Sequence, residues 1–343
     1  MSVFGSEPFH ARVGRPGRVC AVALAVSALI AVGSARGAES PAKAADFPIK
    51  PVRLIVPFAP GGSSDSVARM ISSKLAEAWG QQVLVENRPG ANTAIGAGFV
   101  ARSAPDGYTL YLANANHTVN PALFKAQPYD PVKDFVAISQ IANQTVVLLV
   151  HPSVPAKSVR DLIKLARARP GELNFASPGV GTSSHMTGVL FQALAKIDMV
   201  FVSYKGAGPS LVDLIGGQVT IGSSGLTSAL QYLDSGRLRA LGVTTLKRSV
   251  LKPEIPTISE AGLPGFEVTN WFGILGPAGM PTTVVERIHQ QVAKVLSDES
   301  NRQLIFKMGL EPSISGPGQF GAFMRTEIDK WVRVIREAGI RQE

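Results

Sequence analysis

The sequence predicts an α/β fold with two lobes, in which each lobe is a mostly parallel sheet flanked by helices and a ligand cleft lies between the lobes. Apolar segments of strand length alternate with amphipathic helical segments along nearly the whole chain, which is typical of parallel strands joined by helices. The order strand, Gly/Ser-rich turn and helix occurs at 56–70 and is repeated at 173–191, once for each lobe. The chain of 343 residues is long enough for both lobes, because a domain usually has about 100–200 residues.

The first residues have the composition of an export signal. Three arginines lie within the first eighteen residues, an almost wholly apolar segment follows at 19–32, and small residues come next. The apolar segment is shorter than the ~18–20 residues that a membrane-spanning helix needs. Residues 1–35 are therefore expected to be a secretory signal peptide. The single cysteine, Cys20, lies inside it, so the exported chain should have no disulfide.

The first lobe is expected to contain residues 46–144 and 271–343. Its first strands are expected at 52–58, 83–86 and 108–113. The helix after the first strand has apolar side chains on one face and should stop at Gly80. The segment 114–117 (Asn-Ala-Asn-His) follows the third strand at its carboxyl end, where open α/β sheets usually bind ligands.

The second lobe is expected at 145–270, after a crossing that Asn143 and Gln144 mark between two apolar segments. Ser158, with Asp161 three residues later, predicts the start of its first helix. Its strands are expected at 173–176, 199–204, 219–222 and 238–244.

The end of the chain should return to the first lobe. The Pro-containing segment 254–266 is expected to be a surface excursion, and 271–275 a returning strand. From Pro281 on the chain is expected to be helical, and these closing helices should pack on the first lobe.

The two strand-to-helix turns have the chemistry of anion-binding sites. The N–H groups of such a turn have no intrahelical acceptor, and the helix dipole adds partial positive charge. PFAPGGSSD at 57–65 and SPGVGTSSH at 177–185 add flexible glycines and hydroxyl donors. Asp65 is expected to hold its loop as a cap, because its charge would repel an anion. An ordinary capped helix start is the alternative for each turn.

Other kinds of chemistry find little support among the residues. His185 lies beside Ser183 and Ser184, but no G-x-S-x-G elbow surrounds them, so a hydrolase is only an alternative. No spacing of His, Asp, Glu or Cys predicts a metal site, and neither a P-loop nor a dinucleotide-binding motif is present. The net charge of +9 comes from scattered basic residues, which argues against nucleic-acid binding. No cofactor, metal or catalytic residue is expected.

With these motifs in hand, the chain closely resembles the Bug family (Bordetella uptake gene type), the periplasmic solute-binding proteins of tripartite tricarboxylate transporters. The motifs that carry the resemblance, in the order and spacing of the family, are KPVRLIVPFAPGGSSDSVAR, VENRPGAN, DGYTLYLAN, SPGVGTSSH, YKGAGPSLVDLIGGQV, IPTISEAGLPGFEV and WFGILGPAGMP. The resemblance covers essentially the whole mature chain. It implies a type II-like periplasmic binding protein whose two lobes close over a carboxylated solute.

The resemblance also implies which residues bind the ligand. The carboxylate would be held between the two turns, and two asparagines and a Tyr-Lys pair would complete the wall. The implied ligand-binding residues are Phe58, Ala59, Gly61, Gly62, Ser63, Ser64, Asn114, Asn116, Ser177, Gly181, Thr182, Ser183, Tyr204 and Lys205. One departure is Thr220, where the family commonly has an aspartate, and it puts recognition of a ligand amine at that edge in doubt.

The leading hypothesis is a non-enzymatic periplasmic receptor that captures a small organic carboxylate. It would deliver this ligand to the membrane permease subunits of a tripartite tricarboxylate transporter or to a sensor kinase. The alternatives are a periplasmic hydrolase that uses His185 and a nearby serine, and a sensory accessory protein for a two-component system. A monomer without a nucleic-acid partner is expected.

Overall fold

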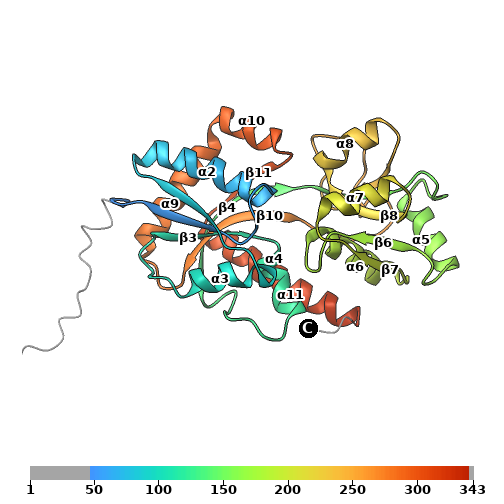
Figure 1. Cartoon of the computed structure of the whole chain (residues 1–343), viewed down its shortest axis with the longest axis horizontal. Coiled ribbons are helices and arrows are strands. Elements are labelled where there is room, and N and C mark those ends of the chain that lie inside the picture. The colour runs from blue at the N-terminus through green and yellow to red at the C-terminus, as the bar shows by residue number, and fades with distance from the viewer. Residues whose placement is uncertain (1–46, 340–343) are drawn as a thin grey trace, which may run out of the picture. The chain divides into compact units, whose positions relative to one another are not determined.

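The computed structural model describes residues 47–339, so the predicted signal peptide at 1–35 lies outside the described residues. The described strands form two sheets (Figure 1). The strands of the first sheet, in order across it, are β11 (Glu311–Ser315), β4 (Phe135–Gln144), β10 (Asn270–Pro277), β3 (Thr109–Asn114), β1 (Val52–Val56) and β2 (Val83–Asn87). Those of the second are β7 (Val200–Ser203), β6 (Asn174–Ser177), β8 (Ile221–Gly225), β5 (Val146–Val150) and β9 (Arg239–Val243).

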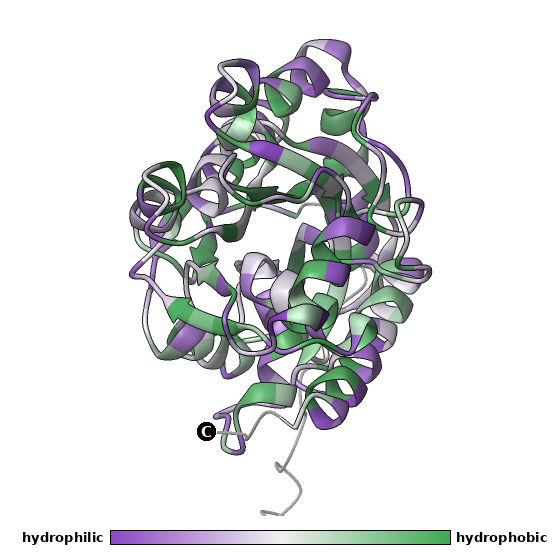
Figure 2. Ribbon diagram, turned by 90° about the vertical axis from the view of Figure 1, so that its right-hand side faces the viewer, coloured by the Kyte–Doolittle hydropathy of each residue, from purple (hydrophilic) through white to green (hydrophobic). Residues whose placement is uncertain are grey.

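The helices mostly follow individual strands. The helices that lie next to first-sheet strands along the chain are α2 (Ser63–Trp79), the short 3₁₀ segment η1 (Ala91–Thr93), α3 (Ala94–Ala101), α4 (Asn116–Leu123), α9 (Thr282–Ser297), α10 (Glu299–Lys307) and α11 (Pro317–Glu337). The helices that lie between second-sheet strands along the chain are α5 (Val159–Ala168), α6 (Ser183–Ala195), α7 (Ala207–Ile215) and α8 (Leu226–Asp234). Figure 2 shows purple and green alternating along several helices, as expected when one helix face is buried and the other is solvated.

The α/β class is confirmed, but the sheets are mixed rather than mostly parallel. β1 pairs in parallel with β2 and β3, and β6 pairs in parallel with β7 and β8. Next to each parallel set lies an antiparallel strand, β10 in the first sheet and β5 in the second. These two strands are antiparallel to their neighbours because the chain passes between the two sheets there: β5 begins two residues after β4 ends, and β10 returns the chain to the first sheet. The returning strand was predicted at 271–275, but alternation of strands and helices could not reveal the antiparallel direction of these two strands, because no helix directly precedes either of them.

Both sheets use the same strand order. The series β2-β1-β3-β10-β4 corresponds, position for position, to β7-β6-β8-β5-β9. In each series the fourth strand is the crossing strand. β11 extends the first sheet beyond this shared pattern, and it corrects the expectation that the chain is helical throughout from Pro281.

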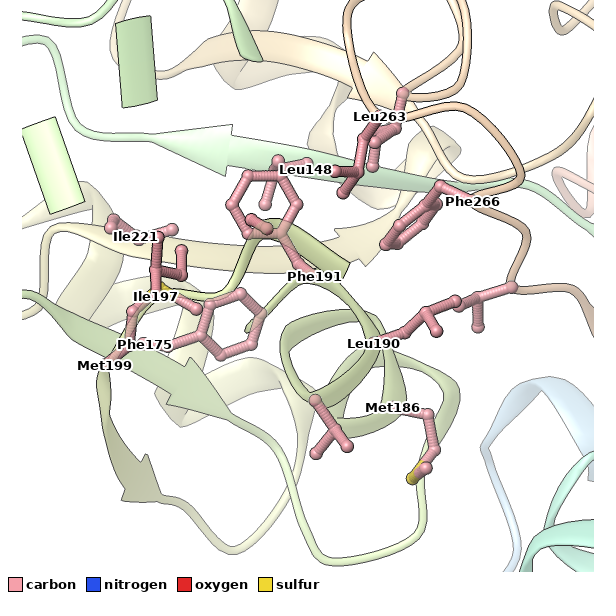
Figure 3. Packing of buried hydrophobic residues seen from close by; sticks show 14 of the residues in the cluster. Leu148, Phe175, Met186, Leu190, Phe191, Ile197, Met199, Ile221, Leu263 and Phe266 are labelled. Atoms are coloured by element: carbon pink, nitrogen blue, oxygen red, sulfur yellow. The ribbon is translucent and has the colours of Figure 1, made fainter. Parts of the chain in front are cut away.

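The segment 254–266 is not a surface excursion. Ile258 and Phe266 are fully buried and Leu263 is nearly so, and the Phe266 ring meets the Phe191 ring edge-on at 6.3 Å (Figure 3). The prolines and glycines were misleading because the backbone of this segment is satisfied by the second sheet: Ile258 N–H donates to the carbonyl of Val243 at 2.9 Å.

The closing helices contact the first sheet, as expected, through α9 and α11 against β4. The last turns of α11 also belong to the large core cluster of the second lobe, where Trp331, Val334 and Ile335 are buried with α6 residues. Val119 and Leu123 of α4 join the same cluster. Helices α4 and α11 therefore take part in the core of the second lobe, whereas the first sheet has a separate apolar cluster that includes Tyr111, Trp271 and Phe320.

Gly188, in α6, is the helical glycine with the least space for a side chain among the described residues, and a substitution can test this packing. A Cβ at Gly188 would lie 2.6 Å from Cε1 of Phe201 and 2.9 Å from Cε1 of Phe175. Gly188→Ala should therefore lower the free energy of unfolding by about 1–3 kcal/mol, although alanine favours the helix itself. Gly318→Ala in α11 is the matched control, because nothing lies within 4 Å of the added Cβ, and it should be neutral or slightly stabilising. Urea unfolding measures both; equal effects would show that the contact does not limit packing.

Candidate functional site

The carboxyl ends of the parallel strands bring the predicted loops to one edge of each sheet. β1, β2 and β3 lie side by side in the first sheet, so the segments that follow them emerge together. β6, β7 and β8 do the same in the second sheet. The first predicted loop lies between β1 and α2, and the second between β6 and α6.

Asp65 holds the first loop from inside helix α2. Its Oδ2 accepts the N–H of Gly61 at 3.1 Å and Nε of Arg69 at 2.9 Å, and its Oδ1 accepts Nδ2 of Asn87 at 3.0 Å. The same amide of Asn87 donates to the carbonyl of Phe58 at 3.0 Å. The hydrogen bond from Arg69 is the main cause that lowers the pKa of Asp65 to about 2. Asp65 is thus a buried anion that fixes the loop.

The rest of the first loop is open to solvent. Ala59, Gly61, Gly62 and Ser63 are exposed, whereas Ser64 is buried. Gly62 is the N-cap of α2 and no side chain caps it. The N–H groups of Ser63 and Ser64 lie in the first turn, where no intrahelical carbonyl is available to them. They can therefore donate to a ligand.

The second loop is capped by Thr182. Its hydroxyl accepts the N–H of His185 at 3.2 Å and donates to the carbonyl of Gly179 at 2.8 Å. The hydroxyls of Ser177 and Ser183 are buried and have no hydrogen-bond partner among the described residues. Buried hydroxyls are normally paired, so these two unpaired ones are candidates for hydrogen bonds to a polar ligand.

The two loops share one hydrogen-bonding arrangement around a glycine. Gly61 and Gly181 both have positive φ, 93° and 77°, and the N–H of each is accepted by the side chain four residues later. The acceptor is the carboxylate of Asp65 in the first loop and Nδ1 of His185, at 3.3 Å, in the second. Burial lowers the pKa of His185 to about 4, which keeps the imidazole neutral at pH 7. The second loop therefore has no fixed negative charge beneath it.

Four asparagines form a connected cluster beside the loops. Asn114 Oδ1 accepts the N–H of Asn116 at 3.1 Å, and Nδ2 of Asn116 donates to Oδ1 of Asn92 at 3.2 Å. Nδ2 of Asn92 donates to Oδ1 of Asn120 at 2.7 Å. The sequence interpretation identified Asn114 and Asn116 but missed Asn92 and Asn120, which lie after β2 and inside α4.

Asn92 sits in a strained turn. Ala91, Asn92 and Thr93 all have positive φ, at 44°, 46° and 78°. Non-glycine residues in this region each cost about 1–3 kcal/mol and cluster at functional sites. The last residue of VENRPGAN, Asn92, was the available sequence signal for this turn, because asparagine tolerates left-handed backbone better than other non-glycine residues.

Gly181 brings the second loop against the asparagine cluster. A Cβ at Gly181 would lie 3.0 Å from Nδ2 of Asn92 and 3.6 Å from Nδ2 of Asn116. Residues from the two sheets thus meet at this point, with no room for a side chain on the loop.

The side chains of Tyr204 and Lys205 make no hydrogen bond to either loop within the described residues. Tyr204 N–H donates to the carbonyl of Ser177 at 2.8 Å, but its phenol donates to Oδ2 of Asp213 at 2.9 Å. Lys205 is exposed. Thr220 precedes β8 and is bound by Oδ1 of Asn174 at the amino end of β6. It lies at the opposite edge from the two loops, so the residue at this position does not indicate whether the site recognises a ligand amine.

In the described part of the chain, His185 forms no hydrogen-bonded pair with a serine, and no metal centre is found. Nδ1 of His185 is occupied by Gly181, and no serine hydroxyl of residues 47–339 is hydrogen-bonded to that imidazole. Within the same residues, no group of three His, Cys, Asp or Glu side chains could hold a metal ion. No described helix is long and apolar enough to cross a membrane.

The chain is similar to proteins of one family over most of its length. Residues 67–340 match the family model described as "Tripartite tricarboxylate transporter family receptor". A structure of Rpa4515 from R. palustris with adipate superposes with a TM-score of 0.76 at 35% identity, covering 87% of this chain and 100% of that one. The periplasmic binding protein BugD gives 0.74 at 30% identity, with 87% and 100% covered. MatC from Rhodopseudomonas palustris, with bound malate, gives 0.72 at 32% identity, with 84% and 100% covered.

The buried histidines predict how stability depends on pH. Burial lowers the pKa of His117 and of His185 to about 4 each, whereas an unfolded histidine has a pKa of about 6.5. The unfolded chain therefore binds more protons between these values, so stability is full above pH ~6.5 and falls as the pH drops toward ~4, by roughly 2–3 kcal/mol per histidine. His185→Gln, which keeps an acceptor for Gly181, should remove about half of this loss. Urea unfolding between pH 4 and 7.5 checks it; an unchanged slope would contradict the assignment.

Proposed function

The chain belongs to the tripartite tricarboxylate transporter receptor family, and from this premise we propose that it captures a small organic carboxylate between its two lobes. In this proposal it is a non-enzymatic receptor in the periplasm. It delivers the ligand to the permease of a tripartite tricarboxylate-type transporter.

The observation that carries the proposal is the pair of unpartnered hydroxyls of Ser177, at the end of β6, and Ser183, at the start of α6. A carboxylate accepts two to four hydrogen bonds and donates none, so it matches two free hydroxyls beside a helix N-terminus. The neutral His185 beneath the loop opposes no anion. The adipate and malate in the two neighbouring structures are both dicarboxylates and support this class of ligand.

The first loop and the asparagines supply the opposite wall. Ser63 and Ser64 offer the backbone N–H groups of the first turn of α2, and Asp65 holds the loop in place. Asn114 and Asn116 offer amide groups, and Lys205 offers a positive charge at the rim. Contacts from both lobes stabilise the closed arrangement over an open one, which is the differential affinity that a conformational switch requires.

A receptor role is favoured over hydrolysis because His185 serves as a structural acceptor. With Nδ1 accepting from Gly181, its remaining ring nitrogen carries the proton in the neutral imidazole and cannot act as a base toward a serine. Purified protein should therefore release no product from aryl esters. Turnover that is lost in His185→Gln would favour the hydrolase instead.

Export and delivery complete the proposal. The pattern of residues 1–35 and the description of BugD as periplasmic support a periplasmic location. In this proposal the protein is a monomer that meets membrane permease subunits. Delivery to a sensor kinase is the second candidate for the partner. Deletion of the permease genes separates the two, because it abolishes uptake but leaves a signalling response intact.

The double variant Thr182→Ala with Ser183→Ala tests the second loop. It removes one free hydroxyl and the cap that positions it, so the dissociation constant for a bound carboxylate should rise at least tenfold, since a hydrogen bond to a charged group contributes about 1.5–3 kcal/mol. Isothermal titration calorimetry measures the binding.

Ser158→Ala is the matched control. Ser158 caps α5 through the N–H of Asp161 at 3.1 Å, away from both loops. Its loss should cost about 1 kcal/mol of stability, like the loss of the Thr182 cap, without changing affinity. Equal affinities in the double variant and the wild type would remove this loop from the site.

A further inference from the structure

A cavity of about 490 Å³ lies between α3, the end of α4 and the segment that follows α4. Its volume is within the 300–1,000 Å³ that is usual for small-molecule sites. Most of its lining is apolar, with Ile95, Phe124 and Pro128 as the largest such side chains. It is separate from the residues that the sequence predicted to bind a ligand, none of which lines it.

One end of this cavity touches the proposed carboxylate site. Asn92 and Asn120 line the cavity, and Asn92 also accepts from Asn116 and lies against Gly181. The strained turn at 91–93 is therefore a wall common to the cavity and the second loop. A ligand held by that loop could extend past Asn92 into the cavity.

The other end offers a cation and an unsatisfied amide. Arg102 lines the cavity, and its Nη1 lies 3.3 Å from the Cβ position of Gly98, one helical turn back along α3. Arg102 is exposed, and its guanidinium makes no ion pair or hydrogen bond within the residues that the structure describes. Both amide atoms of Gln127 are shielded from solvent and have no partner there. A charged donor and an unpaired amide at the end of an apolar cavity fit an anionic group on an apolar chain.

Building on the proposed function, we propose that this cavity receives the apolar body and the second carboxylate of an elongated dicarboxylate, whose first carboxylate is held by the two loops. Arg102 binds the second carboxylate and Gln127 hydrogen-bonds it. The preferred substrate class is then a dicarboxylate with a chain longer than that of a four-carbon acid.

The dimensions agree with such a ligand. Asn92 and Gly98 are six positions apart; the four positions from Ala94 to Gly98 within α3 alone rise roughly 6 Å at ~1.5 Å per residue, and the turn at 91–93 adds to this length. An extended chain spans about 3.3–3.6 Å per three bonds, so the seven bonds between the carboxyl carbons of an eight-carbon dicarboxylate span about 8 Å. The four-carbon acid spans less than half of this distance and leaves the Arg102 end empty.

The experiment compares three ligands by calorimetry: succinate, suberate, and octanoate, which has the length of suberate but a single carboxylate. The wild type should bind suberate at least tenfold more tightly than either of the others. Arg102→Gln should weaken suberate at least tenfold and change succinate less than twofold. Arg169→Gln, at an exposed position after α5 in the second lobe, is the control and should change neither.

A second variant tests the cavity without removing charge. Ala126 lines the cavity and is exposed, so Ala126→Trp should fill the space without unfolding the chain, and it should weaken suberate but not succinate. Tight binding of suberate that neither variant reduces, or equal losses for succinate and suberate, would refute the cavity while leaving the receptor intact. Failure of the wild type to bind any carboxylate would instead refute the proposed function, and this inference with it.

Discussion

The antiparallel strand inside each sheet is the constraint on which the rest of the structure depends. β5 pairs with β8 and β9, and β10 pairs with β3 and β4, so each crossing strand is hydrogen-bonded on both sides. Backbone groups in a buried strand must be paired, which fixes both the position and the direction of the crossing. The carboxyl ends of the parallel strands then have one possible edge in each sheet. Gly181 of one lobe meets Asn92 of the other because the crossing strands hold these edges in place.

The two loops show how one backbone device can serve two electrostatic roles. Each uses a positive-φ glycine whose N–H is accepted by the side chain four residues later. The aspartate of the first loop is compensated by Arg69 and Asn87, so its charge is neutralised locally. The histidine of the second loop is neutral because burial disfavours its charged form. In the proposed site, an anion between the loops would therefore meet oriented N–H groups on one side and free hydroxyls on the other, without an uncompensated carboxylate.

Local patterns were sufficient to predict much of this architecture. The helix of α2 and its end at Gly80, the cap at Ser158 and the two Gly/Ser turns follow from residues that interact within four positions of one another. The strand direction at the crossings, β11 and the burial of 254–266 depend on pairing with segments far away in the sequence. Asn120 illustrates the same limit, because it lies inside α4 and acquires a role only when the fold brings Asn92 to it. The predicted site residues themselves stay a prediction until a ligand is measured.

The turn at 91–93 connects these separate features. Three successive left-handed residues are unfavourable by about 1–3 kcal/mol each, so the surroundings must stabilise them. Asn120 does so directly: its Nδ2 donates to the carbonyl of Asn92 at 2.6 Å and to Oγ1 of Thr93 at 3.2 Å, while its Oδ1 accepts from Asn92. In this conformation Asn92 Oδ1 accepts the amide of Asn116 at 3.2 Å. The left-handed turn therefore aims one side chain at the second loop while its other face lines the cavity beside α3. A ligand that bridges both places would find its path already shaped by this turn, and its binding energy need not be used to form it.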